Sequence, residues 1–164
     1  VGGVKVDLRT PAEMEAAIAE MSERIETAGL SLDGFLIQRM LKGGHEVIFG
    51  VSSDPRMGPI LMFGLGGKYV EVFHDVRFAV PPISPAQARD VVRGIRGHRL
   101  LEGVRGDAPA DEEALVEVLL RLAQLVERHP RILELDINPW LAFPAGGRSC
   151  AVDVQIRIGT PTPA

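Results

Sequence analysis

The stretch "ELDINPW", residues 134–140, places polar side chains inside a run that is otherwise apolar. Successive residues of a β-strand point to opposite faces. A strand here therefore puts Asp136 and Asn138 on one face and Leu135 and Ile137 on the core face. Pro139 has no N–H to donate, so the strand is predicted to lose its pairing at that residue. We expect the two oxygen-bearing side chains at a strand end, where a ligand can reach them.

A third oxygen-bearing side chain, Asp153, follows Asn138 by fifteen residues, inside the apolar run "AVDVQI" at 151–156. A hairpin through the "PAGG" turn at 144–147 would bring Asp153 beside Asn138. Carboxylate and amide oxygens at a strand end suit Mg²⁺ and leave room for a phosphate. In the alternative, Asp136 caps a turn, Asn138 begins one, and Asp153 is an exposed strand residue. Spacing alone leaves both interpretations open.

Composition limits the classes of protein to consider. The chain has 164 residues, of which 46% are apolar and 24% charged, a balance typical of one globular domain. The net charge of −4 argues against nucleic-acid binding, which needs a basic face. One cysteine, Cys150, excludes a disulfide framework and favours a reducing, cytoplasmic setting. No apolar run approaches the roughly 20 residues of a membrane span.

Hydrophobic periodicity and turn residues predict strands alternating with helices. Strands are expected at residues 1–9, 34–40, 46–54, 60–64, 131–138 and 150–158, and towards the end of 68–80. Helices are expected at 10–28, 84–95 and 111–129, and residues 100–110 are expected to form a loop. Hairpins mixed with helices indicate an α+β fold, with a mostly antiparallel sheet and flanking helices.

Two further stretches could bind a nucleotide. Gln38 and Arg39 end one predicted strand, and Glu46 begins the next across a turn. Backbone groups of such a hairpin can hydrogen-bond to an adenine, and a nearby carboxylate can hydrogen-bond to ribose hydroxyls. An ordinary surface hairpin has the same pattern. The glycine loop at 64–67 lacks the Lys-Ser/Thr of a P-loop, and we interpret it as a structural turn.

The order of several segments resembles a known family. These are "VGGV" (1–4), "FLIQRM" (35–40), "GGHEVIFGV" (43–51), "DPRMGPILMFGLGG" (54–67), "LLEGVRG" (100–106), "ELDINPW" and "AVD" (151–153). Together they resemble the C-terminal part of the ATP-grasp domain of nucleoside-diphosphate-forming acyl-CoA synthetases, with succinyl-CoA synthetase β subunits as more distant relatives. The resemblance implies an ATP-grasp fragment at 1–158, with a lid-lobe part (about 1–51) lacking its N-terminal portion, a C-terminal lobe (about 52–158), and a linker at 159–164.

The resemblance also implies roles for individual residues. Asn138 and Asp153 match residues that bind Mg²⁺, and Asp136 matches the catalytic acid that faces a phosphohistidine. The positions that contact ATP or ADP in the family match Gln38, Arg39, Met40 and Glu46. The implied reaction converts acyl-CoA, ADP and phosphate into acid, CoA and ATP, with a CoA-binding and phosphohistidine domain or subunit as partner. The fragment alone is expected to be inactive, and a homo-oligomer is left open.

Some positions depart from the family pattern. Ala79 and Gln155 stand where arginines are expected, although Arg77 lies nearby. The family's phosphate-binding lysine is expected upstream of Val1. The amide of Gln155 does not replace the charged, forked guanidinium of an arginine, and Ala79 carries no cation. These changes weaken the case for catalysis. The alternative is a degenerate, ligand-sensing domain fused to a protein lysine acetyltransferase of the GNAT type.

Overall fold

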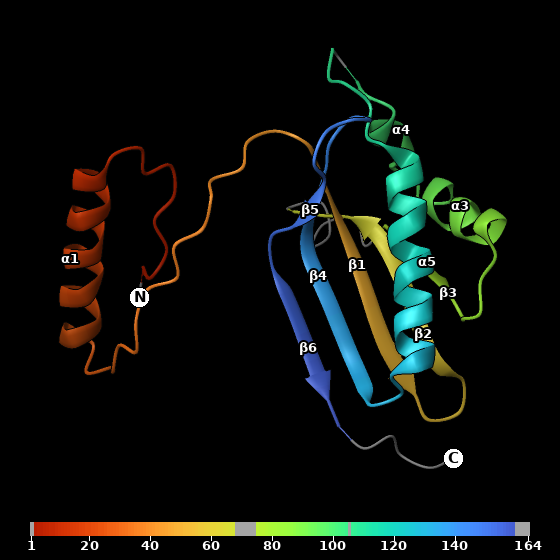
Figure 1. Ribbon diagram of the computed structural model, residues 1–164, viewed down its shortest axis with the longest axis horizontal. Coiled ribbons are helices and arrows are strands. Elements are labelled where there is room, and N and C mark those ends of the chain that lie inside the picture. Colours follow the sequence, from red (N-terminus) through yellow and green to blue (C-terminus); the bar gives the residue numbers. More distant parts are fainter. Residues whose placement is uncertain (1, 68–74, 105, 160–164) are drawn as a thin grey trace. The chain divides into compact units, whose positions relative to one another are not determined.

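A computed structural model describes residues 2–67, 75–104 and 106–159. The chain divides into two compact units, Val1–Lys42 and Gly43–Ala164 (Figure 1). The predicted lobe boundary near residue 51 falls inside a strand of the second unit, and the assignment of lobes stays a prediction. Within the described residues, no helix has the length and apolar character that a membrane crossing requires.

The first unit contains one helix, α1 (Pro11–Thr27), which begins as predicted. The Thr10 hydroxyl accepts a hydrogen bond from the Glu13 N–H at 3.2 Å, and the Glu13 carboxylate accepts one from the Thr10 N–H. The predicted strands at 1–9 and 34–40 are wrong, since residues 2–9 and 34–40 are irregular, and residue 1 lies outside the described part of the chain. A strand needs a neighbour to bond its N–H and C=O groups, and the described part of this unit supplies none.

The second unit is built on an antiparallel sheet, as predicted. Its strands are β1 (His45–Asp54), β2 (Gly58–Leu65), β3 (Val76–Ala79), β4 (Ile132–Ala142), β5 (Cys150–Ala151) and β6 (Val154–Ile158). The sheet order is β3-β2-β1-β4-β5, and β6 also pairs with β4 (Figure 1). Of the predicted segment 68–80, residues 76–79 form β3, and residues 68–74 lie outside the described part of the chain.

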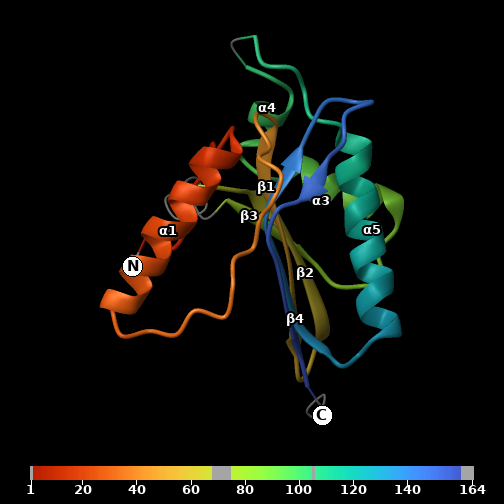
Figure 2. The same cartoon turned by 60° about the vertical axis from the view of Figure 1, so that its left-hand side comes forward.

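Helices cover one face of this sheet. Both α3 (Pro85–Arg93) and α5 (Glu112–Arg128) lie on the same side of it (Figure 2). Alternate residues of the central strands point into the core between them: Val47, Phe49, Val51, Leu61, Phe63, Leu65, Leu135 and Ile137. A short helix, α4 (His98–Leu101), was not predicted and overlaps the start of the expected loop. It has no side-chain cap, so the sequence carries no start signal for it.

Strand β4 continues past Pro139, which corrects the prediction that pairing ends there. Phe49 pairs with Ile137 and Val47 pairs with Trp140, so two residues of β4 face one residue of β1. Such a bulge accommodates a proline because the extra residue is left out of the ladder. On the other side of β4, the predicted strand 150–158 is interrupted at 152–153 and forms two strands, β5 and β6.

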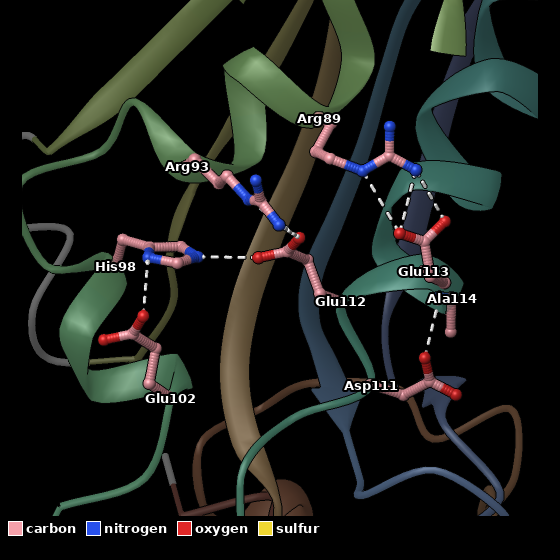
Figure 3. Close-up of polar contacts among 8 residues, drawn as sticks. All are labelled: Arg89, Arg93, His98, Glu102, Asp111, Glu112, Glu113 and Ala114. Atoms are coloured by element: carbon pink, nitrogen blue, oxygen red, sulfur yellow. Dashed lines mark hydrogen bonds and ion pairs between the residues drawn. The ribbon is translucent and has the colours of Figure 1, made fainter. Parts of the chain in front are cut away.

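Ion pairs join the helices at the start of α5 (Figure 3). Glu112 accepts hydrogen bonds from the Arg93 Nε and the His98 Nε2, each at 2.9 Å. Arg89 makes a second pair with Glu113, using two nitrogens. Partial burial on its own raises the pKa of Glu112, but the hydrogen bonds from Arg93 and His98 more than offset this, so the net pKa lies below its ordinary value.

Replacing a fully buried leucine of α5 should test the core. Leu119→Ala is expected to lower the free energy of unfolding by about 2–5 kcal/mol, because it leaves a cavity beneath the sheet. Urea unfolding followed by circular dichroism measures the change. Leu36→Ala is the matched control, since Leu36 is 85% exposed and should cost little. Equal losses in the two variants would contradict the assigned core.

Glu112→Gln should weaken the contact between α5 and α3 in a pH-dependent way. Because the folded pKa of Glu112 is depressed, its contribution is present above its ordinary value of 4.5 and is lost as pH falls below it. We expect the variant to be less stable by about 1 kcal/mol at pH 7, with the difference disappearing near pH 3. Urea unfolding across this range measures it. Glu117→Gln, which breaks an exposed pair with Arg121, should show almost no loss.

Candidate functional site

The sheet face opposite the helices carries the predicted polar residues. Residues that pair directly across neighbouring strands share a face. One such row crosses the sheet from Phe78 to Met62, Gly50, Asp136 and Gln155. In the described part of the second unit no helix lies on this side, and we refer to it as the open face. Asp136 and Asn138 are both exposed, as the alternation in the sequence predicted.

Asp153 lies directly across from Asn138 at the bulge. The Asn138 N–H donates to the Asp153 carbonyl oxygen at 3.2 Å, and the Val152 N–H donates to the Pro139 carbonyl oxygen at 3.0 Å. This register continues the pairing of Asp136 with Gln155, so Asp136, Asn138 and Asp153 share the open face. The structure therefore brings together the three residues that the sequence singled out, while their roles stay predictions.

The electrostatics of this cluster are unfavourable without a cation. Partial burial raises the pKa of Asp136, and the neighbouring carboxylate of Asp153 raises it further. Gln155 contributes only an amide, whose Nε2 lies 3.5 Å from an Asp153 carboxylate oxygen. In the described chain, no three His, Cys, Asp or Glu side chains form a group that could hold a metal. A metal here would thus rely on two carboxylates and the Asn138 amide.

Glu46 lies on the same face of β1 as Gly50, four residues earlier, which corresponds to about 13 Å along a strand. Its carbonyl oxygen accepts a hydrogen bond from the Gly66 N–H at 2.7 Å. A Cβ on Gly66 would lie 2.8 Å from the backbone of Glu46. The glycine loop is therefore needed for this close approach, which agrees with its interpretation as a structural turn.

The other predicted nucleotide contacts, Gln38, Arg39 and Met40, lie in an irregular segment of the first unit. Glu46 belongs to the second unit. A nucleotide held by both sets stays a prediction.

Ala79, one of the two positions that depart from the family pattern, faces away from this cluster, and so does the nearby Arg77. Ala79 pairs with Leu61 and Arg77 pairs with Phe63, and both partners point into the core. The Arg77 Nε donates to the Gly94 carbonyl oxygen at 2.6 Å. An arginine at position 79 would therefore point to the helical side, so Ala79 does not remove a cation from the open face. Of the two departures, only Gln155 lies beside Asp153.

A hollow of about 890 Å³ extends along the open face from Asp136. Met57, Ile60, Met62, Phe78 and Val80 line its apolar side, and the Glu134–Arg157 ion pair lines the other. These apolar residues were not singled out in the sequence. The pattern that could have identified two of them is the strand "GPILMFG", residues 58–64. Alternation along it places Ile60 and Met62 on the face opposite Leu61 and Phe63.

Removing the charge of Asp136 should stabilise the protein in metal-free buffer. A raised folded pKa means that ionised Asp136 opposes folding above its ordinary pKa, and that this cost vanishes in acid. We expect Asp136→Asn to raise the free energy of unfolding at pH 7 by up to about 1 kcal/mol, with no gain near pH 3. Urea unfolding in EDTA measures this. A less stable variant at pH 7 would contradict the described repulsion.

Known proteins are similar to this chain in sequence. The model of the ATP-grasp domain family matches residues 1–158. The chain is 40% identical to the ADP-forming acetate–CoA ligase I of Archaeoglobus fulgidus, over 97% of the chain and 23% of that protein. It is 38% identical to the β subunit of the ADP-forming acetate–CoA ligase I of Pyrococcus furiosus, over 87% of the chain and 62% of the subunit.

A solved structure shows the same fold. The acetyl-coenzyme A synthetase 1 of Ca. Korarchaeum cryptofilum, in complex with coenzyme A and Mg-AMPPCP, matches with a TM-score of 0.84 and 37% identity. The match covers 96% of this chain and 68% of that one, whose phosphohistidine segment points towards the nucleotide binding site. With 158 of its residues matched by the family model, the chain belongs to the ATP-grasp domain family.

Proposed function

We propose that the chain is the nucleotide-binding module of an ADP-forming acyl-CoA synthetase. The observation that carries the proposal is the cluster of Asp136, Asn138 and Asp153 on the open face, with Glu46 on the same face of β1. The whole protein would interconvert acyl-CoA, ADP and phosphate with acid, CoA and ATP. Because the chain spans 23% of the ligase from Archaeoglobus fulgidus, the other domains or subunits must supply the acyl and CoA chemistry.

The donor set fits Mg²⁺. All three side chains offer oxygen, the ligand that Mg²⁺ prefers, and a cation would relieve the repulsion between Asp136 and Asp153. We assign Asn138 and Asp153 as the metal-binding residues. When bound, Mg²⁺ would neutralise charge on the phosphates during transfer. We also propose Glu46 of the second unit as a nucleotide-binding residue, and Gln38, Arg39 and Met40 of the first unit as the residues that match nucleotide contacts of the family.

The transfer itself would pass a phosphoryl group to a histidine of the partner domain or subunit. A neutral imidazole nitrogen attacks the γ-phosphorus, the P–O bond to ADP breaks, and ADP leaves with the bonding electrons. The resulting phosphoimidazole carries a positive charge and keeps its remaining N–H. Asp136 would accept a hydrogen bond from that N–H, which would favour the charged ring.

The regulatory alternative predicts a different outcome. A ligand-sensing domain fused to an acetyltransferase needs a bound nucleotide but no phosphoryl transfer. The relatives described above are ligases and give this alternative no support. Position 79, whose alanine had weakened the case for catalysis, faces the core side. A cytoplasmic location stays a prediction based on the single cysteine.

Asp153→Asn in the full-length parent protein tests the proposed function. The change keeps the size of the side chain and removes one negative charge from the metal-binding set. We expect the rate of histidine phosphorylation from labelled Mg-ATP to fall by about 10²-fold, the scale for losing one electrostatic element of a transition state. Acid-labile, base-stable label on the protein measures this rate.

Asp107→Asn is the matched control, since Asp107 is an exposed loop residue away from the open-face rows. It should leave the labelling rate unchanged. No label in the wild-type protein would contradict the synthetase proposal and favour a regulatory domain. Label that persists at the wild-type rate in Asp153→Asn would show that Asp153 is not a metal ligand.

A further inference from the structure

The glycine loop that follows β2 lies against Glu46, the residue of β1 proposed to bind the nucleotide. Val47 and Leu65 form the end pair of the ladder between β1 and β2. One step beyond this pair, the Gly66 N–H donates a hydrogen bond to the Glu46 carbonyl oxygen at 2.7 Å. Because the sheet fixes both segments up to this point, the place of the loop beside Glu46 is fixed as well.

The two glycines of the loop approach different parts of Glu46. A Cβ on Gly66 would lie 2.8 Å from the Glu46 carbonyl carbon and 2.9 Å from the Val47 nitrogen, so Gly66 approaches backbone atoms. A Cβ on Gly67 would instead overlap the Glu46 Oε2 and lie 3.1 Å from the Glu46 Cδ. The Glu46 carboxylate therefore occupies the space into which any other residue at position 67 would project its side chain.

Two independent constraints favour glycine at position 67. The φ of Gly67 is +61°, in the left-handed region that is costly for most residues with a side chain but that asparagine tolerates. The space taken by the Glu46 carboxylate excludes every side chain, that of asparagine included. A turn alone would need only the first property. The second property indicates that Gly67 matters for where the Glu46 carboxylate lies.

A side chain at position 67 would change the rotamer of Glu46 more than it would change the fold. Glu46 is exposed, and its carboxylate is the far end of a flexible side chain that can rotate away at little cost. A carboxylate that has left its place must be brought back before it can bind a ligand, and that ordering lowers the affinity. A substitution of Gly67 would thus act on ligand binding through Glu46.

We propose that Gly67 is a positioning residue for nucleotide binding, which acts by leaving room for the Glu46 carboxylate; this inference rests on the proposed function and deepens it. In the rotamer that Gly67 permits, the carboxylate would accept hydrogen bonds from hydroxyl groups of the nucleotide. A side chain at position 67 would drive the carboxylate into another rotamer and weaken binding. Gly66 has a different role, because its neighbours are backbone atoms and its replacement would disturb the ladder itself.

Gly67→Asn in the full-length parent protein tests this role, with Gly58→Asn as the matched control. Gly58 also has a left-handed backbone, with a φ of +76°, but a Cβ there would meet nothing within 4 Å. We expect Gly67→Asn to raise the Kd for Mg-ADP, measured by calorimetry, by about tenfold, the scale of one hydrogen bond to a charged group. Gly58→Asn should leave this Kd within about twofold of the wild-type value. Gly67→Ala and Gly58→Ala provide a second pair should Gly67→Asn unfold.

A double-mutant cycle with Glu46→Ala tests whether Gly67 acts through Glu46. Glu46→Ala removes both the carboxylate and the overlap at position 67. We expect Glu46→Ala to raise the Kd for Mg-ADP by about tenfold, and the addition of Gly67→Asn to weaken binding no further. Losses that add in the double variant would mean that Gly67 acts by another route, and they contradict the inference.

The remaining outcomes separate this inference from the proposed function. Wild-type affinity for Mg-ADP in both Gly67→Asn and Gly67→Ala overturns the inference and leaves the proposed function standing. Equal weakening in the Gly58 variants would trace the loss to the backbone conformation and likewise contradicts the inference. Wild-type affinity in Glu46→Ala removes Glu46 from the binding site, and the role of Gly67 with it. A wild-type protein that does not bind Mg-ADP overturns the proposed function and this inference together.

Discussion

The hydrogen bond from the Asn138 N–H to the Asp153 carbonyl oxygen fixes the register on which the site depends. Side chains alternate along a strand, so a slip of one residue would send Asp153 to the helical side. Leu135 and Ile137 fix the facing of β4 itself, because a one-residue slip of β4 against β1 would expose them from the core. The same alternation that closes the core therefore holds Asp136, Asn138 and Asp153 on the open face.

The two faces of the sheet do not stabilise the fold equally. The helical face is apolar and closely packed, whereas the open face carries two neighbouring carboxylates and the row of exposed apolar side chains. Partial burial and, after it, the neighbouring carboxylate of Asp153 both raise the pKa of Asp136. Residues that stabilise neither the core nor each other are typical of sites selected for binding. If the proposed function holds, a nucleotide and a cation would bind on this unfavourable face.

Sequence patterns correctly predicted the helix caps and the alternation of side chains, because these features depend on neighbouring residues. The caps of α1 and α3, the leucine stripe of α5 and the alternation around Asp136 all rest on residues close together in the chain. Pairing between distant segments was harder to predict. Residues 1–9 and 34–40 have strand-like patterns but pair with no strand among the residues that the structure describes. Pro139 is accommodated by a bulge that only the position of β1 reveals. For the same reason, the side of the sheet on which Ala79 lies could be found only from the register of β3 against β2.

Strand β1 contributes residues both to the core and to the open face. Its core face supplies Val47, Phe49 and Val51, and its open face runs from Glu46 past Gly50 to Ser52. Phosphoryl transfer depends mostly on positioning, and a strand bonded on both sides keeps distances along it constant. If the proposed roles hold, the backbones of β1 and of β4, which pairs with it, set the spacing between Glu46 and the acidic cluster, and flexible loops do not. Gly50, which pairs with Asp136, is the residue of β1 whose lack of a side chain lets Met62 extend over the strand beside that acid.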